Sequence, residues 1–106
     1  MIDSLEKMLA KGVDNALLRF GLGKGYLDQG DATAATLHLQ CCVEQDPAYS
    51  AAWKLLGKAL ENTGDSEGAR QAWEQGLSAA QAKGDKQAEK EMGVFLKRLA
   101  RRQGGQ

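Results

Sequence analysis

The sequence contains few of the residues on which secreted, membrane-spanning or metal-binding proteins depend. It has one proline, one histidine and two cysteines. The cysteines, Cys41 and Cys42, are adjacent and cannot easily reach the Cα separation of a disulfide, so we expect free thiols in a reducing compartment. No apolar run approaches the ~18 residues of a membrane helix, and the first residues lack the basic and apolar segments of a secretory signal. These absences predict a cytoplasmic protein.

An excess of charge of one sign is also missing. Fourteen acidic and fourteen basic side chains give a net charge of zero, so overall electrostatics favours neither a polyanion nor a membrane surface as partner. The distribution is uneven, however. Residues 1–82 carry eleven acidic and seven basic side chains, whereas residues 83–106 carry three and seven. Positive charge is therefore concentrated at the C-terminal end.

The residues that are abundant predict an all-α chain. Ala, Leu, Lys, Glu and Gln are abundant and β-branched residues are few, which favours helices throughout. The length of 106 residues fits one domain, 1–106. Apolar residues recur at helical spacing between breaks, with Asp3, Asp14 and Ser50 as candidate helix caps. We expect a short N-terminal helix at 3–12, hairpins at 15–48 and 49–84, a single helix at 85–102 and a tail at 103–106.

The two predicted hairpins are copies of one another. A shift of 34 residues superimposes residues 15–47 on the second hairpin with six identities, against roughly two expected by chance. The identical pairs are Leu22 and Leu56, Gly23 and Gly57, Lys24 and Lys58, Gly30 and Gly64, Asp31 and Asp65, and Ala35 and Ala69. At a shift of 36, Met92-Gly93-x-x-Leu96 repeats Leu56-Gly57-x-x-Leu60. A third, partial copy therefore contributes one helix without a partner.

This pattern resembles the tetratricopeptide repeat, in which W-x2-L-G-x2-Y, A-x3-F and P recur over 34 residues. The second copy supplies Trp53, Leu56, Gly57, Ala69 and Trp73. The first copy supplies Leu22, Gly23, Tyr26, Ala35, Leu39 and Pro47. The resemblance implies a right-handed α-solenoid of antiparallel helical hairpins, whose last helix covers the end of the stack.

Two groups of residues resemble a phosphate-binding loop and a metal site, but each lacks parts that such a site needs. The stretch Gly21-Leu22-Gly23-Lys24-Gly25 resembles a phosphate loop, yet no strand precedes it and no Ser or Thr follows the lysine, so we expect close helix packing there. His38, Cys41 and Cys42 have ligand spacing but no second pair to complete a metal site, and we expect His38 on a solvated face. We therefore expect no enzyme, no metal and no cofactor.

Trp53 and Trp73 fit an interhelical core better than a ligand cage. The basic cluster near the C-terminus, formed by Lys97, Arg98, Arg101 and Arg102, could contact nucleic acid. It equally complements the dipole at the end of a helix, and we favour that interpretation.

The resemblance implies that a peptide lies along the first helix of each hairpin. Five lysines would then share one basic groove with an apolar end, suited to an acidic segment or a free C-terminal carboxylate. The predicted ligand-binding residues are Phe20, Lys24, Leu27, Lys54, Lys58, Lys90 and Lys97. The alternative, lysines that only solvate the surface, remains open. The expected function is non-catalytic protein binding by an adaptor. Self-assembly is the second hypothesis, and nucleic-acid contact through the last helix the third.

Overall fold

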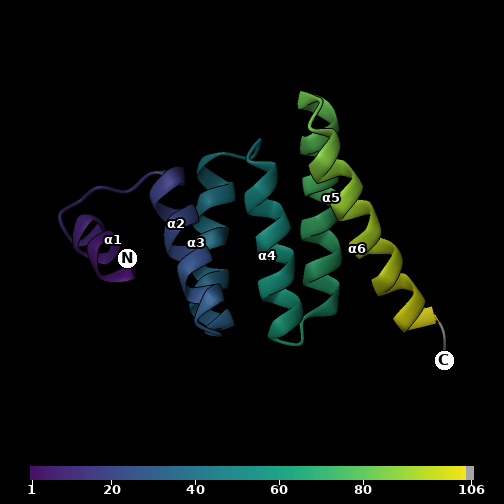
Figure 1. Ribbon diagram of the computed structural model, residues 1–106, viewed down its shortest axis with the longest axis horizontal. Helices are drawn as coiled ribbons and strands as arrows, with labels where there is room; N and C mark the ends of the chain where they lie inside the picture. The colour runs from purple at the N-terminus through teal and green to yellow at the C-terminus, as the bar shows by residue number, and fades with distance from the viewer. Residues whose placement is uncertain (105–106) are drawn as a thin grey trace.

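The computed structural model describes residues 1–104, which form six helices and no strand (Figure 1). This confirms the all-α prediction. The helices are α1 (Ile2–Ala10), α2 (Ala16–Asp28), α3 (Ala32–Gln45), α4 (Ser50–Asn62), α5 (Ser66–Lys83) and α6 (Lys86–Gly104). Of the tail expected at 103–106, the first two residues continue α6, and residues 105–106 lie outside the described part.

Both hairpins turn in the same way. Gly30 and Gly64 have φ angles of 85° and 91°, a region in which a residue without a Cβ is favoured. The next residues, Asp31 and Asp65, each accept a hydrogen bond from the backbone N–H three residues later, at 3.1 and 2.8 Å. A left-handed glycine thus closes one helix and an aspartate cap opens the next.

Three of the expected caps are different in the structure. Asn15, rather than Asp14, caps α2 by accepting from Leu18 N at 2.8 Å. Neither α1 nor α4 has a side-chain cap. Ser50, expected to cap α4, is buried and donates instead to Asp85 at 3.0 Å. Tertiary partners compete for such side chains, as the bond between Ser50 and Asp85 illustrates.

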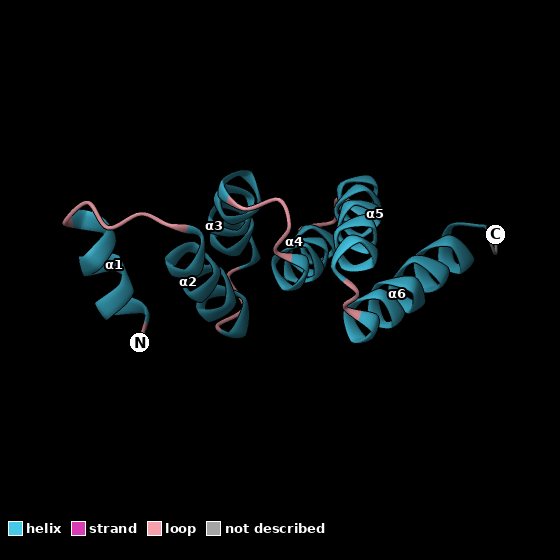
Figure 2. Ribbon diagram, turned by 90° about the horizontal axis from the view of Figure 1, so that it is seen from above, coloured by secondary structure: helices cyan, strands magenta, loops and turns pink. Residues whose placement is uncertain are grey.

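The helices stack in two layers. Figure 2 shows α2, α4 and α6 in one layer and α3 and α5 in the other, with α1 beside α2 at the N-terminal end. Each helix packs on the next one along the chain, and α4 also touches α2 and α6. The protein is therefore an elongated stack, 47 × 30 × 18 Å, with an outer surface on each layer.

Glycine lets the two helices of each hairpin approach closely. A Cβ built on Gly23 would stand within 3.0 Å of Leu39, and one built on Gly57 within 3.0 Å of Trp73. The buried side chains of Leu39 and Trp73 fill these positions. The expectation that the tryptophans pack in the core is confirmed, since Trp73 is 2% exposed and the half-buried Trp53 packs against both core clusters.

The short N-terminal helix covers the outer side of α2. Ile2 and Leu5 lie against Gly25 and Gly21, so the glycine-rich stretch packs helices together, as expected. The carboxylate of Glu6 accepts a hydrogen bond from the Tyr26 hydroxyl at 2.5 Å. This helix therefore closes the N-terminal end of the stack.

The expectation of a solvated His38 is wrong. Its side chain is buried, with its ring stacked on Tyr26 at 5.5 Å and Nδ1 3.1 Å from the guanidinium of Arg19. Burial lowers the pKa of His38, and the cation of Arg19 acts in the same direction.

Candidate functional site

The first helices of the hairpins, α2 and α4, line up with α6 to form one surface, the α2–α4–α6 face. Two of the predicted lysines on it are already paired. Lys24 lies 3.2 Å from Asp28 on the same helix, and Lys54 reaches across to Glu91 of α6 at 2.8 Å. The hydrogen bond from Lys54 is the main reason that the pKa of Glu91 lies below its ordinary value. Both lysines are thus partly neutralised.

Farther along this face, α4 and α6, with Trp73 of α5, line a small hollow of about 60 Å³. Lys58 lies over the ring of Phe95, with Nζ 4.3 Å from the ring centre, a cation–π contact. Arg102 pairs with Glu61, and Arg98 lines the same hollow. Within residues 1–104, neither Lys58 nor Arg98 has a carboxylate in salt-bridge range. We call Lys58 and Arg98 the cation pair.

The five lysines are not gathered in one groove. Lys90 and Lys97 line a separate hollow between α5 and α6. Lys97 follows Phe95 by two residues, and two helical steps of about 100° turn it to the far side of α6. The expected single basic groove is therefore divided by α6, with Lys58 on one side and Lys90 and Lys97 on the other.

The predicted apolar end of the surface is mostly part of the core. Phe20 stacks on Tyr49 with ring centres 4.8 Å apart, and Phe20 and Leu27 are half-buried against the first core cluster. Leu17, one helical turn before Phe20, is 73% exposed. An apolar contact near α2 would therefore involve Leu17 and the exposed edges of Phe20 and Leu27.

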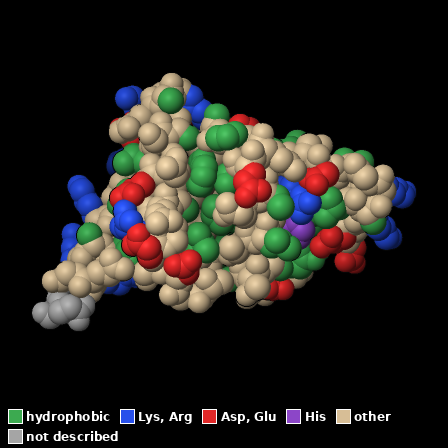
Figure 3. Space-filling model, turned by 180° about the vertical axis from the view of Figure 1, so that it is seen from behind, with side chains coloured by type: hydrophobic (Ala, Val, Ile, Leu, Met, Phe, Trp, Pro, Cys, Tyr) green, Lys and Arg blue, Asp and Glu red, His purple; other side chains and the backbone are tan. Residues whose placement is uncertain are grey.

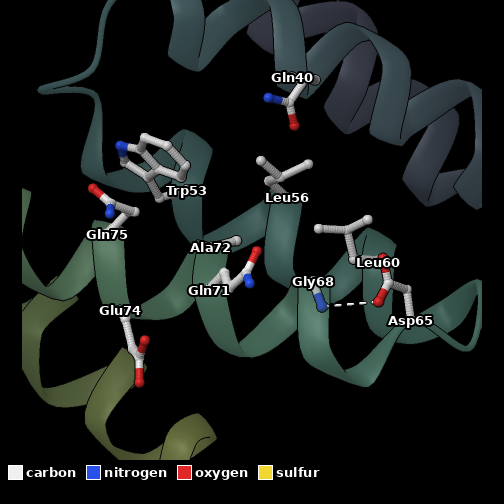
Figure 4. Close-up of a pocket in the computed structure, with 10 residues that line it drawn as sticks. All are labelled: Gln40, Trp53, Leu56, Leu60, Asp65, Gly68, Gln71, Ala72, Glu74 and Gln75. Carbon is white, nitrogen blue, oxygen red and sulfur yellow. Dashed lines mark hydrogen bonds between the residues drawn. The ribbon is translucent and has the colours of Figure 1, made fainter.

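The opposite surface carries a groove that sequence reasoning missed. Figure 3 shows hydrophobic side chains along the middle of this face. A hollow of about 420 Å³ lies there, with α4 as its floor between α3 and α5. Trp53, Leu56 and Leu60 of α4 line it, and Gln40 and Gln71 stand at its rim (Figure 4). The half-exposed edge of Trp53 leaves no separate signal in the sequence, because its helical spacing is that of a core residue.

The histidine, cysteine and acidic side chains are the candidates for metal binding and thiol chemistry. Residues 1–104 contain no group of three or more His, Cys, Asp or Glu side chains able to hold a metal ion. Cys41 and Cys42 are free thiols, and burial raises the pKa of Cys42 to about 11. None of the helices in this part combines the length and apolar character needed to cross a bilayer.

Comparisons with known proteins agree with this architecture. Residues 26–89 match the family model described as tetratricopeptide repeat. The chain is 75% identical, over 95% of its length and 96% of the relative, to TPR repeat-containing protein PA0015 of Pseudomonas aeruginosa. The solution structure of protein BPP2914 from Bordetella parapertussis is similar with a TM-score of 0.83 at 56% identity, covering 96% of this chain and 89% of that one.

A more distant structure shares the fold alone. The tetratricopeptide repeat domain protein from Salinibacter ruber gives a TM-score of 0.75 at 23% identity, covering 81% of this chain and 96% of that chain. Repeats of this kind are generally non-catalytic modules for protein–protein interaction or scaffolding. The chain belongs to the tetratricopeptide repeat family, as shown by the matched segment and the 75% identical relative, and its two hairpins share the close helix approach at Gly23 and Gly57.

Proposed function

We propose that the α2–α4–α6 face binds a protein segment that is acidic or ends in a free carboxylate, and that the cation pair Lys58 and Arg98 is the centre of recognition. The observation that carries this proposal is that both side chains line one hollow and neither has a carboxylate partner among residues 1–104. A ligand carboxylate would complete the charge balance there.

The geometry favours Lys58 in this role. Its contact with the Phe95 ring holds the ammonium over the hollow, so less side-chain entropy is lost when a ligand binds. A single exposed ion pair contributes only about 0.2 to 1 kcal/mol, so charge alone gives weak binding. Useful affinity requires further contacts along the face, and on α2 the exposed Leu17 and the half-buried Phe20 offer apolar surface.

Lys24 and Lys54 contribute less to ligand binding than the cation pair. Each already has a carboxylate partner, Asp28 or Glu91, and would have to exchange it for the ligand. Exchange of one ion pair for another yields little net free energy. Lys90 and Lys97 lie on the far side of α6 and are left out of this surface. The free thiols of Cys41 and Cys42 fit a reducing compartment, so we place this adaptor role in the cytoplasm.

A pull-down from the native lysate, followed by mass spectrometry, tests the proposal. The bait is the full chain, compared with the double variant Lys58→Glu and Arg98→Glu. A charge-matched control, Lys7→Glu with Lys11→Glu, alters the N-terminal end of the stack. We expect the control to keep the captured proteins and the first variant to lose them, while circular dichroism shows equal helicity. Equal capture by all three baits would overturn the proposal.

A further inference from the structure

Helix α6 is the first helix of a third hairpin whose second helix is missing from the described chain. The repeat places Gly23, Gly57 and Gly93 at equivalent positions. Side chains from α3 and α5 fill the space over Gly23 and Gly57, so that a Cβ there would clash. A Cβ on Gly93 would meet nothing within 4 Å. The seat that each complete hairpin fills with its own second helix is therefore empty on α6.

The empty seat lies in a shallow, open hollow with an apolar base. It measures about 610 Å³ and lies between α5 and α6. Leu77 of α5 and Gly93 and Val94 of α6 line it, and Val94 is 40% exposed. By the repeat, Leu77 corresponds to Val43, which is buried in the first core cluster. The same kind of apolar position is thus left uncovered at the C-terminal end of the stack.

The rim of this hollow is positively charged. Lys86, Lys90 and Lys97 line it, and Glu89 is the single acidic residue among them. One carboxylate oxygen of Glu89 accepts a hydrogen bond from Gln81 at 3.4 Å, while the other is buried without a hydrogen-bond partner among residues 1–104 and lies 3.8 Å from Nζ of Lys86. Lys90 and Lys97 have no carboxylate within salt-bridge range in residues 1–104. The seat therefore combines an apolar base with two unneutralised cations.

We propose that this hollow docks an amphipathic helix of a partner protein, which presents a large apolar side chain over Gly93 and acidic side chains toward Lys90 and Lys97. The chain itself supplies the precedent for the anchor, since Leu39 and Trp73 fill the two equivalent seats. Because Lys90 and Lys97 line the hollow, charge complementarity favours acidic residues beside the apolar anchor of the partner helix. This surface is separate from the cation pair, so the two proposals stand or fall independently.

A second copy of the chain is a poorer occupant. If α6 packed on α6 of another molecule, Lys86, Lys90 and Lys97 of both copies would meet with only the two Glu89 side chains to offset them. Repulsion between like charges opposes that pairing. Two glycines facing each other would also leave the seat without the large side chain that fills its equivalents.

The test uses a synthetic helix with the sequence of α5, the helix that fills the seat over Gly57. The probe is a peptide of residues 66–83 with Arg70→Glu and Lys83→Glu, which keeps Trp73 as anchor and makes the helix acidic. It is titrated into the ¹⁵N-labelled full chain at low salt. We expect saturable shifts of the amide signals around Gly93 below about 1 mM peptide, and little change around Gly57.

Variants on both partners complete the test. Trp73→Ala in the peptide, and separately Gly93→Leu in the protein, are each expected to weaken binding by about tenfold or more. Gly93→Leu points into open space, so the protein keeps its fold. Three results would each overturn the proposal. These are no shift around Gly93 at about 1 mM, affinity unchanged by Gly93→Leu, or a dimer in sedimentation that Gly93→Leu dissociates, since a second copy would then occupy the seat.

Discussion

The indole of Trp73 lies directly against the backbone of Gly57, where a Cβ would stand closer than 3.0 Å to three of its atoms. Its Nε1 donates to the carbonyl oxygen of Lys54 at 3.0 Å. The ring therefore fixes both the distance between α4 and α5 and the rotation of one helix against the other. A similar close approach exists between Gly23 and Leu39, whereas Gly93 has no counterpart.

We expect Gly57→Ala to destabilise the protein. The added methyl group would collide with the rigid, buried ring of Trp73, and overpacking of this kind costs about 1 to 3 kcal/mol. Gly93→Ala is the matched control, because its methyl group meets nothing and replacing glycine inside a helix gains about 0.5 to 1 kcal/mol. Urea unfolding followed by circular dichroism measures both. Equal effects of the two substitutions would contradict the packing account.

The start of α6 depends on Asp85. Its carboxylate accepts from Ala88 N at 3.1 Å and from the buried Ser50 hydroxyl at 3.0 Å, so it joins α6 to α4. Asp85→Ala should cost about 0.5 to 2 kcal/mol of unfolding free energy, whereas Asp85→Asn, which keeps an acceptor, should cost less. Chemical denaturation at neutral pH checks this, and an unchanged unfolding free energy in Asp85→Ala would show that the cap is unimportant.

The contribution of Asp85 to the unfolding free energy should depend on pH. The Ala88 N–H, followed by the Ser50 hydroxyl, lowers the pKa of Asp85 in the folded state. A lowered carboxyl pKa adds stability above the unfolded value of about 3.9, and this stability is lost as the pH falls through the folded pKa. The difference in unfolding free energy between the wild type and Asp85→Ala should therefore shrink from about pH 7 to about pH 3. A constant difference would be inconsistent with the carboxylate acting in its ionised form.

Because of His38, the unfolding free energy should also depend on pH close to neutrality. Burial lowers its pKa below the ordinary value of about 6.5, the carboxylates of Glu6 and Asp14 oppose the shift, and Arg19 adds to it. The unfolded state therefore binds a proton first as the pH falls, and the folded state loses stability below about pH 6.5. The wild type should lose more unfolding free energy than His38→Gln between about pH 7.5 and about pH 5.5. Parallel losses in urea titrations would show that His38 titrates normally.

The ion pair between Lys54 and Glu91 joins α4 to α6, and both side chains are partly shielded from solvent. A double-mutant cycle with Lys54→Met and Glu91→Gln should give a coupling free energy of up to about 1 kcal/mol, because solvent still screens both groups. The measurement is again urea unfolding at neutral pH. Strictly additive single effects would show that the pair contributes nothing to the joint between these helices.

The local features of this fold could be predicted from the sequence. Apolar spacing indicated the helices, and the turns around Gly30 and Gly64 follow from glycine and aspartate in fixed order. The 34-residue repeat then predicted paired helices, because each unit buries its apolar face against the next. All of these depend on residues close together in the chain, where pattern and structure are directly linked.

The candidate sites depended on tertiary structure. The sequence specifies the angle between two residues on one helix but not the rotation of that helix against its neighbours. In α6, Met92 and Leu99 are buried in the second core cluster, and this packing turns Glu91 toward Lys54 while Lys90 and Lys97 face the other side. The sequence alone determined that this is a stack of helical hairpins. Only the packing of α6 decided which of its charges face α4 and which surround the empty seat.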